Sequence, residues 1–339
     1  MTATASRPLL LTQGDPAGIG PELTLKAWLQ RKEARLPPFA ILTDPVFLTR
    51  VAETFGWDVP IQSVAPEEAV SVFDTALPVI PLLANVSANS GKPDPSNARS
   101  IIESIETAVT LVRNGAGAAV VTNPIAKHVL YQAGFTHPGH TEFLASLASD
   151  GGDTPHPVMM LWSETLAVVP VTVHIPLASV PMALTTDLIV RTGRIVARDL
   201  RSRFGIAHPR LALAGLNPHA GENGTMGRED DDIVAPAIAA LRAEGIEATG
   251  PLPADTMFHA RARSRYDAAL AMYHDQALIP IKTIAFDDAV NVTLGLPFVR
   301  TSPDHGTAFD IAGKGLARPD SLMAALGLAA HLSAGAHER

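Results

Sequence analysis

The stretch "ARSIIESIETAVTLVRNGAGAAVVTNP", residues 98–124, joins a helix pattern to a strand pattern. Its first part carries apolar side chains at helical spacing and ends at an Asn-Gly pair, which is a typical helix stop. The short, almost continuous apolar run at 118–124 is typical of a strand that is buried on both faces of a sheet. Together the two patterns predict one step of an alternating α/β fold.

The same alternation continues on both sides of this stretch. A second helix pattern occurs at 232–245, after the acidic run Glu229 to Asp232. We interpret that run as a solvated helix start that suits the helix dipole, with no function of its own. The segment 84–98 is rich in Ser, Asn, Gly and Pro and is predicted to be a loop. Further strand patterns occur at 38–44, 167–176, 210–218 and 267–275.

Three glycine-rich stretches match nucleotide-binding motifs only in part. The stretch at 115–120 follows a helix and precedes a strand, the reverse of the order that a dinucleotide-binding G-x-G-x-x-G requires. The stretch "IAGKG" at 311–315 lacks the first glycine and the Ser or Thr of a P-loop. For "GDPAGIGPE" at 14–22 two interpretations stay open. It is a turn into a helix with Pro21 at its first position, or a set of backbone amides that binds an anion.

The composition of the 339-residue chain limits its possible functions. With 47% hydrophobic and 18% charged residues, it can form one large or two medium cores. The absence of cysteine from the sequence excludes thiolate metal sites and cysteine nucleophiles, so a tightly bound transition metal needs histidine and carboxylate ligands. The net charge of -8 argues against nucleic acid or an anionic membrane surface as a partner. The start shows neither a signal-peptide core nor a span of about 20 apolar residues, so we expect a cytoplasmic enzyme.

Three histidines directly follow strand patterns. His174 follows the run that starts at 167, His219 follows "RLALAGLNP", and His274 follows "DAALAMY". Ligands of open α/β sheets bind beyond the carboxyl ends of the strands, so these imidazoles can converge if their strands share one sheet or two facing sheets. Three neutral imidazoles with an open position suit a catalytic divalent metal ion. Each histidine alone is explained equally well as a hydrogen-bonded core residue.

Two further clusters suggest anion binding. Lys282 and Arg300 are the only Lys and Arg in an otherwise apolar or acidic stretch that also contains Asn291. Arg holds phosphate or carboxylate with two hydrogen bonds and Lys adds a point charge, although both are more often solvated surface cations. His140 and Thr141 follow a Pro-Gly pair and precede a helix pattern, where amides and a hydroxyl can meet a phosphate. Ordinary polar loop residues produce the same pattern.

Six long blocks of unusual sequence extend over nearly the whole chain. They are "GDPAGIGPE" (14–22), "GHTEF" (139–143), "LNPHAGENG" (216–224), "GPLPADT" (250–256), "AMYHDQ" (271–276) and "NVTLGLPFVRTSPDHGTAFDIAGKG" (291–315). In these blocks the chain closely resembles the 4-hydroxythreonine-4-phosphate dehydrogenase (PdxA) family of vitamin B6 biosynthesis. The resemblance implies that the metal ligands are His174, His219 and His274. It implies that the substrate contacts are His140, Thr141, Lys282, Asn291 and Arg300.

The resemblance also implies a fold and an assembly. The fold is a two-domain α/β/α sandwich similar to isocitrate and isopropylmalate dehydrogenases, with the active site in the interdomain cleft. We expect residues 1–125 plus 280–339 to form a first domain on the cofactor side, and residues 126–279 to form a second domain on the metal and dimer side. The implied homodimer shares each active site between two subunits, and both subunits supply metal ligands. Such enzymes bind the nicotinamide cofactor without G-x-G-x-x-G, in agreement with its absence here.

The activity that the resemblance implies is a metal-dependent oxidation by NAD or NADP. The 3-hydroxyl of 4-phosphooxy-L-threonine is oxidised to 2-amino-3-oxo-4-phosphooxybutanoate, which decarboxylates to 3-amino-2-oxopropyl phosphate in pyridoxine and pyridoxal phosphate biosynthesis. The metal is zinc, magnesium or cobalt. The alternative in the same family is a 4-phospho-D-threonate or 4-phospho-D-erythronate dehydrogenase. A metabolite-binding protein without catalysis and a metal-dependent phosphotransferase are rivals from other classes.

The residues that move the proton and hold the cofactor are less defined by these blocks. Three candidates for the proton acceptor remain open, although an Asp beside a ligand histidine serves equally well to orient that histidine. They are Asp255, Asp275 and Lys282. By analogy with the related decarboxylating dehydrogenases, the expected cofactor contacts are His305, Gly306 and Thr307.

Overall fold

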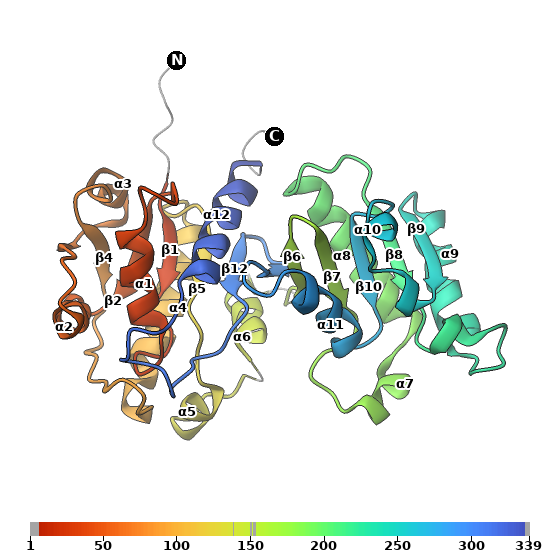
Figure 1. Ribbon diagram of the computed structural model, residues 1–339, viewed down its shortest axis with the longest axis horizontal. Coiled ribbons are helices and arrows are strands. Elements are labelled where there is room, and N and C mark those ends of the chain that lie inside the picture. Colours follow the sequence, from red (N-terminus) through yellow and green to blue (C-terminus); the bar gives the residue numbers. More distant parts are fainter. Residues whose placement is uncertain (1–6, 138, 150, 152–153, 336–339) are drawn as a thin grey trace, which may run out of the picture. The chain divides into compact units, whose positions relative to one another are not determined.

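The computed structural model describes residues 7–137, 139–149, 151 and 154–335, and the chain divides into two compact units. Unit 1 consists of Met1–Pro157 and Leu296–Ala334, and unit 2 of Val158–Gly295 and Gly335–Arg339. Both units contain a sheet with helices on its two faces (Figure 1). The predicted α/β fold class is therefore confirmed.

Unit 1 contains a sheet with the strand order β3-β4-β2-β1-β5-β12, and its described strand pairs are parallel. β1 and β2 are buried along their whole length, because their apolar side chains face helices on both sides. The strands are β1 (Leu9–Thr12), β2 (Phe39–Thr43), β3 (Ile61–Ser63), β4 (Leu77–Pro81), β5 (Val120–Thr122) and β12 (Arg300–Pro303).

The helices of unit 1 cover both faces of this sheet. α4 packs on β1, β2 and β5, and α1 and α12 lie on the opposite face (Figure 1). Ile101 and Ile105 of α4 and Phe143 of α6 share one buried cluster with Leu10 of β1. The helices are α1 (Gly20–Leu29), α2 (Pro45–Phe55), α3 (Ala69–Val72), α4 (Ala98–Arg113), α5 (Lys127–Gln132), α6 (His140–Leu147) and α12 (Asp320–Gly335), with 3-10 turns at Pro66–Glu68 and Pro95–Asn97.

Unit 2 contains a mixed sheet with the order β11-β6-β7-β10-β8-β9. β6 pairs antiparallel with β7 and with β11, and the other described pairs are parallel. The strands are β6 (Val158–Ser163), β7 (Leu166–Pro170), β8 (Arg210–Ala214), β9 (Glu247–Leu252), β10 (Ala268–Ala271) and β11 (Val290–Leu294).

Helices α8 and α9 lie on one face of the unit 2 sheet, and α10 and α11 lie on the other (Figure 1). The helices are α7 (Val180–Ala183), α8 (Thr186–Ser202), α9 (Ala235–Ala243), α10 (Ala260–Arg263) and α11 (His274–Ile284), with 3-10 turns at Leu177–Ser179, Pro218–Gly221 and Ala254–Thr256 and a π turn at Asp230–Val234. Among the described residues, no helix has the length and apolar character that a membrane span requires.

The boundaries of the two units differ from the expected domain boundaries. Residues 126–157 belong to unit 1, because Phe143 and Leu144 of α6 pack in its core against α4. Residues 280–295 belong to unit 2, because β11 pairs with β6 there. The expected roles of a cofactor side and a metal side remain predictions.

The expected helix at 98–115 is confirmed as α4, and the helix at 232–245 as the shorter α9. Three expected strands are shorter than their patterns: the runs at 167–176, 210–218 and 267–275 contain β7, β8 and β10, which end at Pro170, Ala214 and Ala271. After Pro170 the N–H groups of Val171 and Thr172 still donate to the carbonyls of Ala271 and Met272, so this segment stays beside β10 for two further residues. His174 therefore lies in a loop after the strand and not at its last residue.

A buried amide joins three elements of unit 1 at the end of β1. The backbone N–H of Gln13 donates to Ser104 Oγ of α4 at 2.9 Å, and Gln13 Nε2 donates to Ser100 Oγ at 2.9 Å. Gln13 Oε1 accepts from Thr43 Oγ1 of β2 at 2.8 Å. Because Gln13 is only 1% exposed, water cannot replace these bonds.

We expect Gln13→Leu to lower the free energy of unfolding by about 2 kcal/mol or more, since it leaves the hydroxyls of Ser100 and Thr43 buried with one partner fewer. Chemical denaturation of the purified protein measures this change. Gln62→Leu, on the exposed part of β3, is the matched control and should change stability by less than about 0.5 kcal/mol. Equal losses in the two variants would contradict the role of the buried amide.

Candidate functional site

Two of the three strand-end histidines come together in unit 2. The rings of His174 and His274 have centroids 5.5 Å apart and are inclined by 44°. His174 lies in the loop after β7, and His274 is the first residue of α11, directly after β10. Because β7 and β10 are parallel neighbours, both loops leave the same edge of the sheet. The strand-end argument therefore holds for this pair.

The histidine pair lines a hollow of about 230 Å³. His274 Nδ1 lies 2.7 Å from Asp275 Oδ1, which favours the tautomer that carries a proton on Nδ1 and leaves Nε2 as an acceptor. Thr172 beside the pair is held by a 2.7 Å hydrogen bond from its hydroxyl to the carbonyl of Met272. The walls are formed by Thr172, His174, Ile175, Leu177, Val180, Tyr273, His274 and Asp275.

The backbone at two of the histidines is strained. His174 and His219 both have φ of 53°, in the left-handed region that residues with a side chain rarely adopt. Such a conformation costs of order 1 to 3 kcal/mol and persists where surrounding structure determines it, which is common at ligand sites. The shared strain therefore separates His174 and His219 from ordinary loop histidines.

His219 lies apart from the pair within one chain. It sits in the turn Pro218–Gly221 after β8, is exposed, and has Nδ1 3.6 Å from Glu222 Oε2. Among the described residues, no three His, Asp or Glu side chains form a group that could hold a metal ion. Convergence of all three imidazoles is therefore not seen in a single chain, and a ligand set shared by two subunits remains a prediction.

The acidic run Glu229 to Asp232 before α9 is predicted to be a solvated helix start, and for Asp230 this prediction is wrong. Asp230 is 1% exposed, and its carboxylate accepts the backbone N–H groups of Leu216 at 2.7 Å and Asn217 at 3.0 Å. Glu229 Oε2 accepts from Asn217 Nδ2 at 2.8 Å. The run therefore fixes the loop that carries His219, because its carboxylates accept hydrogen bonds from amide groups of that loop.

The remaining predicted residues of unit 2 lie on three elements. Lys282 is in the last turn of α11, with Nζ 5.8 Å from the ring centre of Phe286. Asn291 is on β11 opposite Leu161 of β6. Asp255 is exposed in the 3-10 turn after β9.

A cluster of bases surrounds His140 in unit 1. Arg300 is 4% exposed at the start of β12, and its Nη2 donates to Thr122 Oγ1 at 2.6 Å. His140 and Thr141 start α6, and a Cβ built on Gly139 would lie 2.6 Å from Glu142 Oε2 and 3.0 Å from Lys127 Nζ, so the cluster also contains a carboxylate. Lys127 and Thr122 are not among the residues predicted from the sequence; Thr122 is the last residue of β5, and Lys127 comes three residues after the strand pattern at 118–124.

The cluster shifts the protonation of its members. Burial lowers the pKa of His140 well below its ordinary 6.5, and the nearby charges of Arg300 and Lys127 lower it further. Burial also lowers the pKa of Arg300 to about 10, which leaves the guanidinium charged at neutral pH. His140 Nε2 is buried without a hydrogen-bond partner among the described residues. A neutral imidazole and a charged guanidinium thus lie in one cluster, and anion binding by this cluster remains a prediction.

The turn "GDPAGIGPE" holds the segment that was expected to bind the cofactor. The N–H of Ile19 donates to the carbonyl of Thr307 at 3.0 Å, and a Cβ on Gly18 would lie only 2.9 Å from that oxygen. The N–H groups of Ala17 and Gly18 donate to Asp15. Because these amides are used within the chain, the turn interpretation of this stretch is confirmed and the anion interpretation is not supported.

Helix α1 anchors the next part of the same segment. Lys26 Nζ donates to the carbonyls of Gly315, at 2.7 Å, and Ala317. Glu22 is 2% exposed, and its Oε2 accepts the N–H of Gly315 at 3.4 Å. Burial raises the pKa of Glu22, while these hydrogen bonds and Lys26 oppose the shift. Residues 19–26 thus hold Thr307, Gly315 and Ala317, and His305 and Gly306 lie just before the first of these contacts.

Comparison with known proteins assigns the chain to a family. The sequence model of "Pyridoxal phosphate biosynthetic protein PdxA" matches residues 35–329. The chain belongs to the PdxA family. Proteins named 4-hydroxythreonine-4-phosphate dehydrogenase are 65% identical in Methylorubrum populi, over 98% of this chain and 96% of that protein, and 59% identical in Bradyrhizobium diazoefficiens, over 98% and 99%. The crystal structure of the Klebsiella pneumoniae enzyme of that name is 38% identical, with a TM-score of 0.85 over 97% of this chain and 100% of that chain.

This PdxA-family protein is therefore an enzyme, a dehydrogenase, as predicted from its sequence blocks. The structural match extends over both units, so the loops described above lie on the fold of that family.

We expect the pH dependence of folding to report on His140. Below pH 6.5 the unfolded chain binds a proton at this residue that the folded chain does not, so the free energy of unfolding falls as pH falls, by at most about 1.4 kcal/mol per pH unit. His140→Gln removes this contribution and should flatten the curve between about pH 6.5 and 5. Urea unfolding across this range measures the effect. His208→Gln at an exposed position is the control, and an unchanged slope in His140→Gln would contradict the assignment.

Proposed function

We propose that this enzyme oxidises the 3-hydroxyl of 4-phosphooxy-L-threonine with NAD or NADP. The secondary alcohol loses a proton and a hydride, the nicotinamide accepts the hydride, and the product is 2-amino-3-oxo-4-phosphooxybutanoate. This β-keto acid then loses carbon dioxide to give 3-amino-2-oxopropyl phosphate, an intermediate of pyridoxal phosphate biosynthesis. The paired rings of His174 and His274 carry the proposal, because these residues match the metal histidines that the family resemblance implies.

The donor chemistry of the histidine pair fits a divalent ion. The contact between Asp275 and His274 Nδ1 leaves Nε2 as a metal-binding nitrogen, and the neighbouring hollow has room for a ligand. With His219 as the third ligand, zinc, magnesium or cobalt would supply Lewis acidity at the substrate hydroxyl. We therefore assign Asp275 to orient His274, while Asp255 and Lys282 remain the candidates for the proton acceptor.

The bases of each unit fit the anionic groups of the substrate. In unit 1, charged Arg300 and neutral His140, with Thr141 beside it, offer donors to phosphate or carboxylate in a buried setting. In unit 2, Lys282 and Asn291 are the proposed contacts. Burial of Arg300 strengthens its interaction with an anion, since little water screens its charge.

Exposed apolar side chains around the histidine pair support a homodimer. Leu177 and Met182, in the loop region after His174, are 68% and 87% exposed. Ile279 and Phe286, on and after α11, are 64% and 74% exposed. Of these four, Leu177 lines the hollow of the histidine pair, and large exposed apolar side chains are typical of a surface that another chain covers. A second copy seated there would lie beside His174 and His274, as a shared site requires.

Initial rates of NAD and NADP reduction with three acids test the proposed function. We expect 4-phosphooxy-L-threonine to have a higher kcat/KM than 4-phospho-D-threonate and 4-phospho-D-erythronate, in the presence of zinc, magnesium or cobalt. A clear preference for phospho-erythronate would overturn the proposed substrate. Release of inorganic phosphate without nicotinamide reduction would overturn the proposed reaction.

The third metal ligand gives a separate prediction. His219→Ala should lower kcat/KM by about 100-fold or more, since even partners that only orient ligands cost 10- to 100-fold. Metal content measured on the dialysed protein should fall in parallel. His208→Ala, at an exposed position of unit 2, is the matched control. Full activity and metal content in His219→Ala would rule out its role as a ligand.

The anchoring of the 305–317 segment predicts a change in cofactor use. Lys26→Met removes the charged donor to Gly315 and Ala317, so we expect the KM for the nicotinamide cofactor to rise about 5- to 10-fold while kcat changes less than about 2-fold. Lys32→Met, at an exposed position after α1, should leave both constants unchanged. An equal fall in kcat and kcat/KM would contradict a role limited to cofactor binding.

A further inference from the structure

A second hollow of unit 2 is lined by basic residues, and none of its lining residues has a role in the proposed function. Its volume is about 590 Å³, and it lies between β9 and the segment around α10. None of its lining residues is an Asp or Glu. The lining consists of Thr249, Leu252, Thr256, Met257, His259, Arg261, Ala262, Arg265 and Tyr266.

The positive charge of this hollow is concentrated in one short stretch. "TMFHARARSRY", residues 256–266, contains three arginines and a histidine and no acidic residue, in a chain of net charge -8. The guanidinium groups of Arg261, Arg263 and Arg265 have no hydrogen-bond or ion-pair partner among the described residues, and Arg263 Nη1 is buried in that state. Arg263 does not line the hollow, whereas Arg261 and Arg265 do, and both are exposed, so their guanidinium groups are open to an anion from solvent.

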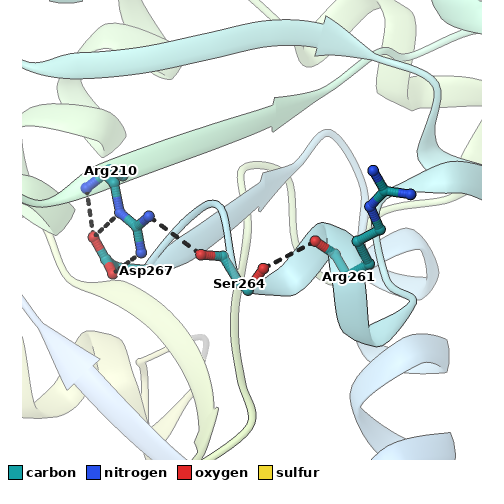
Figure 2. A network of polar contacts seen from close by, with 4 residues as sticks. All are labelled: Arg210, Arg261, Ser264 and Asp267. Carbon is teal, nitrogen blue, oxygen red and sulfur yellow. Dashed lines mark hydrogen bonds and ion pairs between the residues drawn. The ribbon is translucent and has the colours of Figure 1, made fainter.

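The nearest paired acid does not neutralise these arginines. Asp267 is held by Arg210 through bonds of 2.9 Å and 3.2 Å, and Arg210 Nη1 also donates to the carbonyl of Ser264 at 3.2 Å (Figure 2). Ser264 Oγ donates to the carbonyl of Arg261 at 3.0 Å. In Figure 2 the guanidinium of Arg261 extends away from this network. The backbone that carries the arginines is therefore fixed, while the Arg261 head group is available to a ligand.

The floor of the hollow is apolar and rigid. Met257 and Tyr266 are 2% and 8% exposed, and the Tyr266 hydroxyl donates to the Met257 carbonyl at 2.9 Å. His259 Nδ1 accepts the N–H of Ala262 at 3.3 Å, so a neutral His259 ring carries its proton on Nε2 and is a donor. A ligand here meets apolar surface on one side and N–H donors on the other.

We propose that this hollow binds a small phosphate ester, with its phosphate on Arg261, Arg265 and His259 and its organic part on Leu252, Met257 and Tyr266. Arginine forks match phosphate oxygens in pairs, and the apolar floor distinguishes an ester from free phosphate. The site differs in its residues from the His140 and Arg300 cluster and does not depend on the proposed reaction.

Isothermal titration of the full-length protein with pyrophosphate, AMP and adenosine tests this site. We expect AMP to bind more tightly than pyrophosphate, and adenosine not to bind. Arg261→Gln with Arg265→Gln should weaken AMP binding at least 10-fold, and Arg261→Lys with Arg265→Lys should restore part of the affinity. Arg191→Gln, at an exposed position of α8, is the matched control.

Arg300→Gln separates this site from the substrate site, because it should leave the binding that depends on Arg261 and Arg265 unchanged. The proposal is overturned if AMP binding is the same in the Gln double variant and the wild type, or if it is lost only in Arg300→Gln. It is also overturned if adenosine binds as tightly as AMP. A change of sedimentation coefficient in the Gln double variant would place the arginines in a subunit contact and overturn the ligand site as well.

Discussion

Burial of the parallel strands on both faces is the constraint on which the rest of this structure depends. β1, β2 and β10 are buried along their whole length. Their only polar side chains are those of Thr12 and Thr43, at the ends of β1 and β2. Polar chemistry is therefore limited to the loops that follow the strands. Gln13 directly follows β1 and Asn123 directly follows β5, where each forms buried hydrogen bonds, and His274 comes three residues after the end of β10.

The loops at the strand ends are fixed by charged and amide side chains that have no role in the proposed chemistry. Asp230 accepts two amides of the loop that carries His219, and Gln276 joins Met272 to the carbonyl of Gly215 with bonds of 2.7 Å and 2.8 Å. Glu22 and Lys26 hold the segment around Gly315 in the other unit. These side chains bond to backbone N–H and C=O groups that a helix or strand would pair with each other. The irregular backbone at these positions therefore has a defined conformation.

The sequence predicted the repeating parts of the fold and the pair of histidines better than the loops. The helix at 98–113 was predictable because its apolar spacing and its Asn-Gly stop agree with each other. The end of β7 at Pro170 is not predictable from the pattern, because residues of high strand propensity continue to Val173. The burial of Asp230 is not predictable either, because its partners, the amides of Leu216 and Asn217, lie 14 and 13 residues away and leave no periodic signal. A ligand set that joins His219 to the histidine pair across two subunits remains a prediction of the family resemblance, because no pattern within one chain encodes assembly.

The left-handed backbone at His174 and His219 restricts which residues can replace these two histidines. Asn, Asp and Gly tolerate this conformation best, whereas Val, Ile and Thr are excluded by their branched Cβ. The single substitutions that preserve the conformation of both loops are therefore mainly those to Asn and Asp, whose short side chains offer oxygen atoms as ligands. Oxygen donors favour magnesium and manganese over zinc. If His174 and His219 hold the proposed metal, the geometry of these two peptide units therefore limits which metals variants of this enzyme can bind.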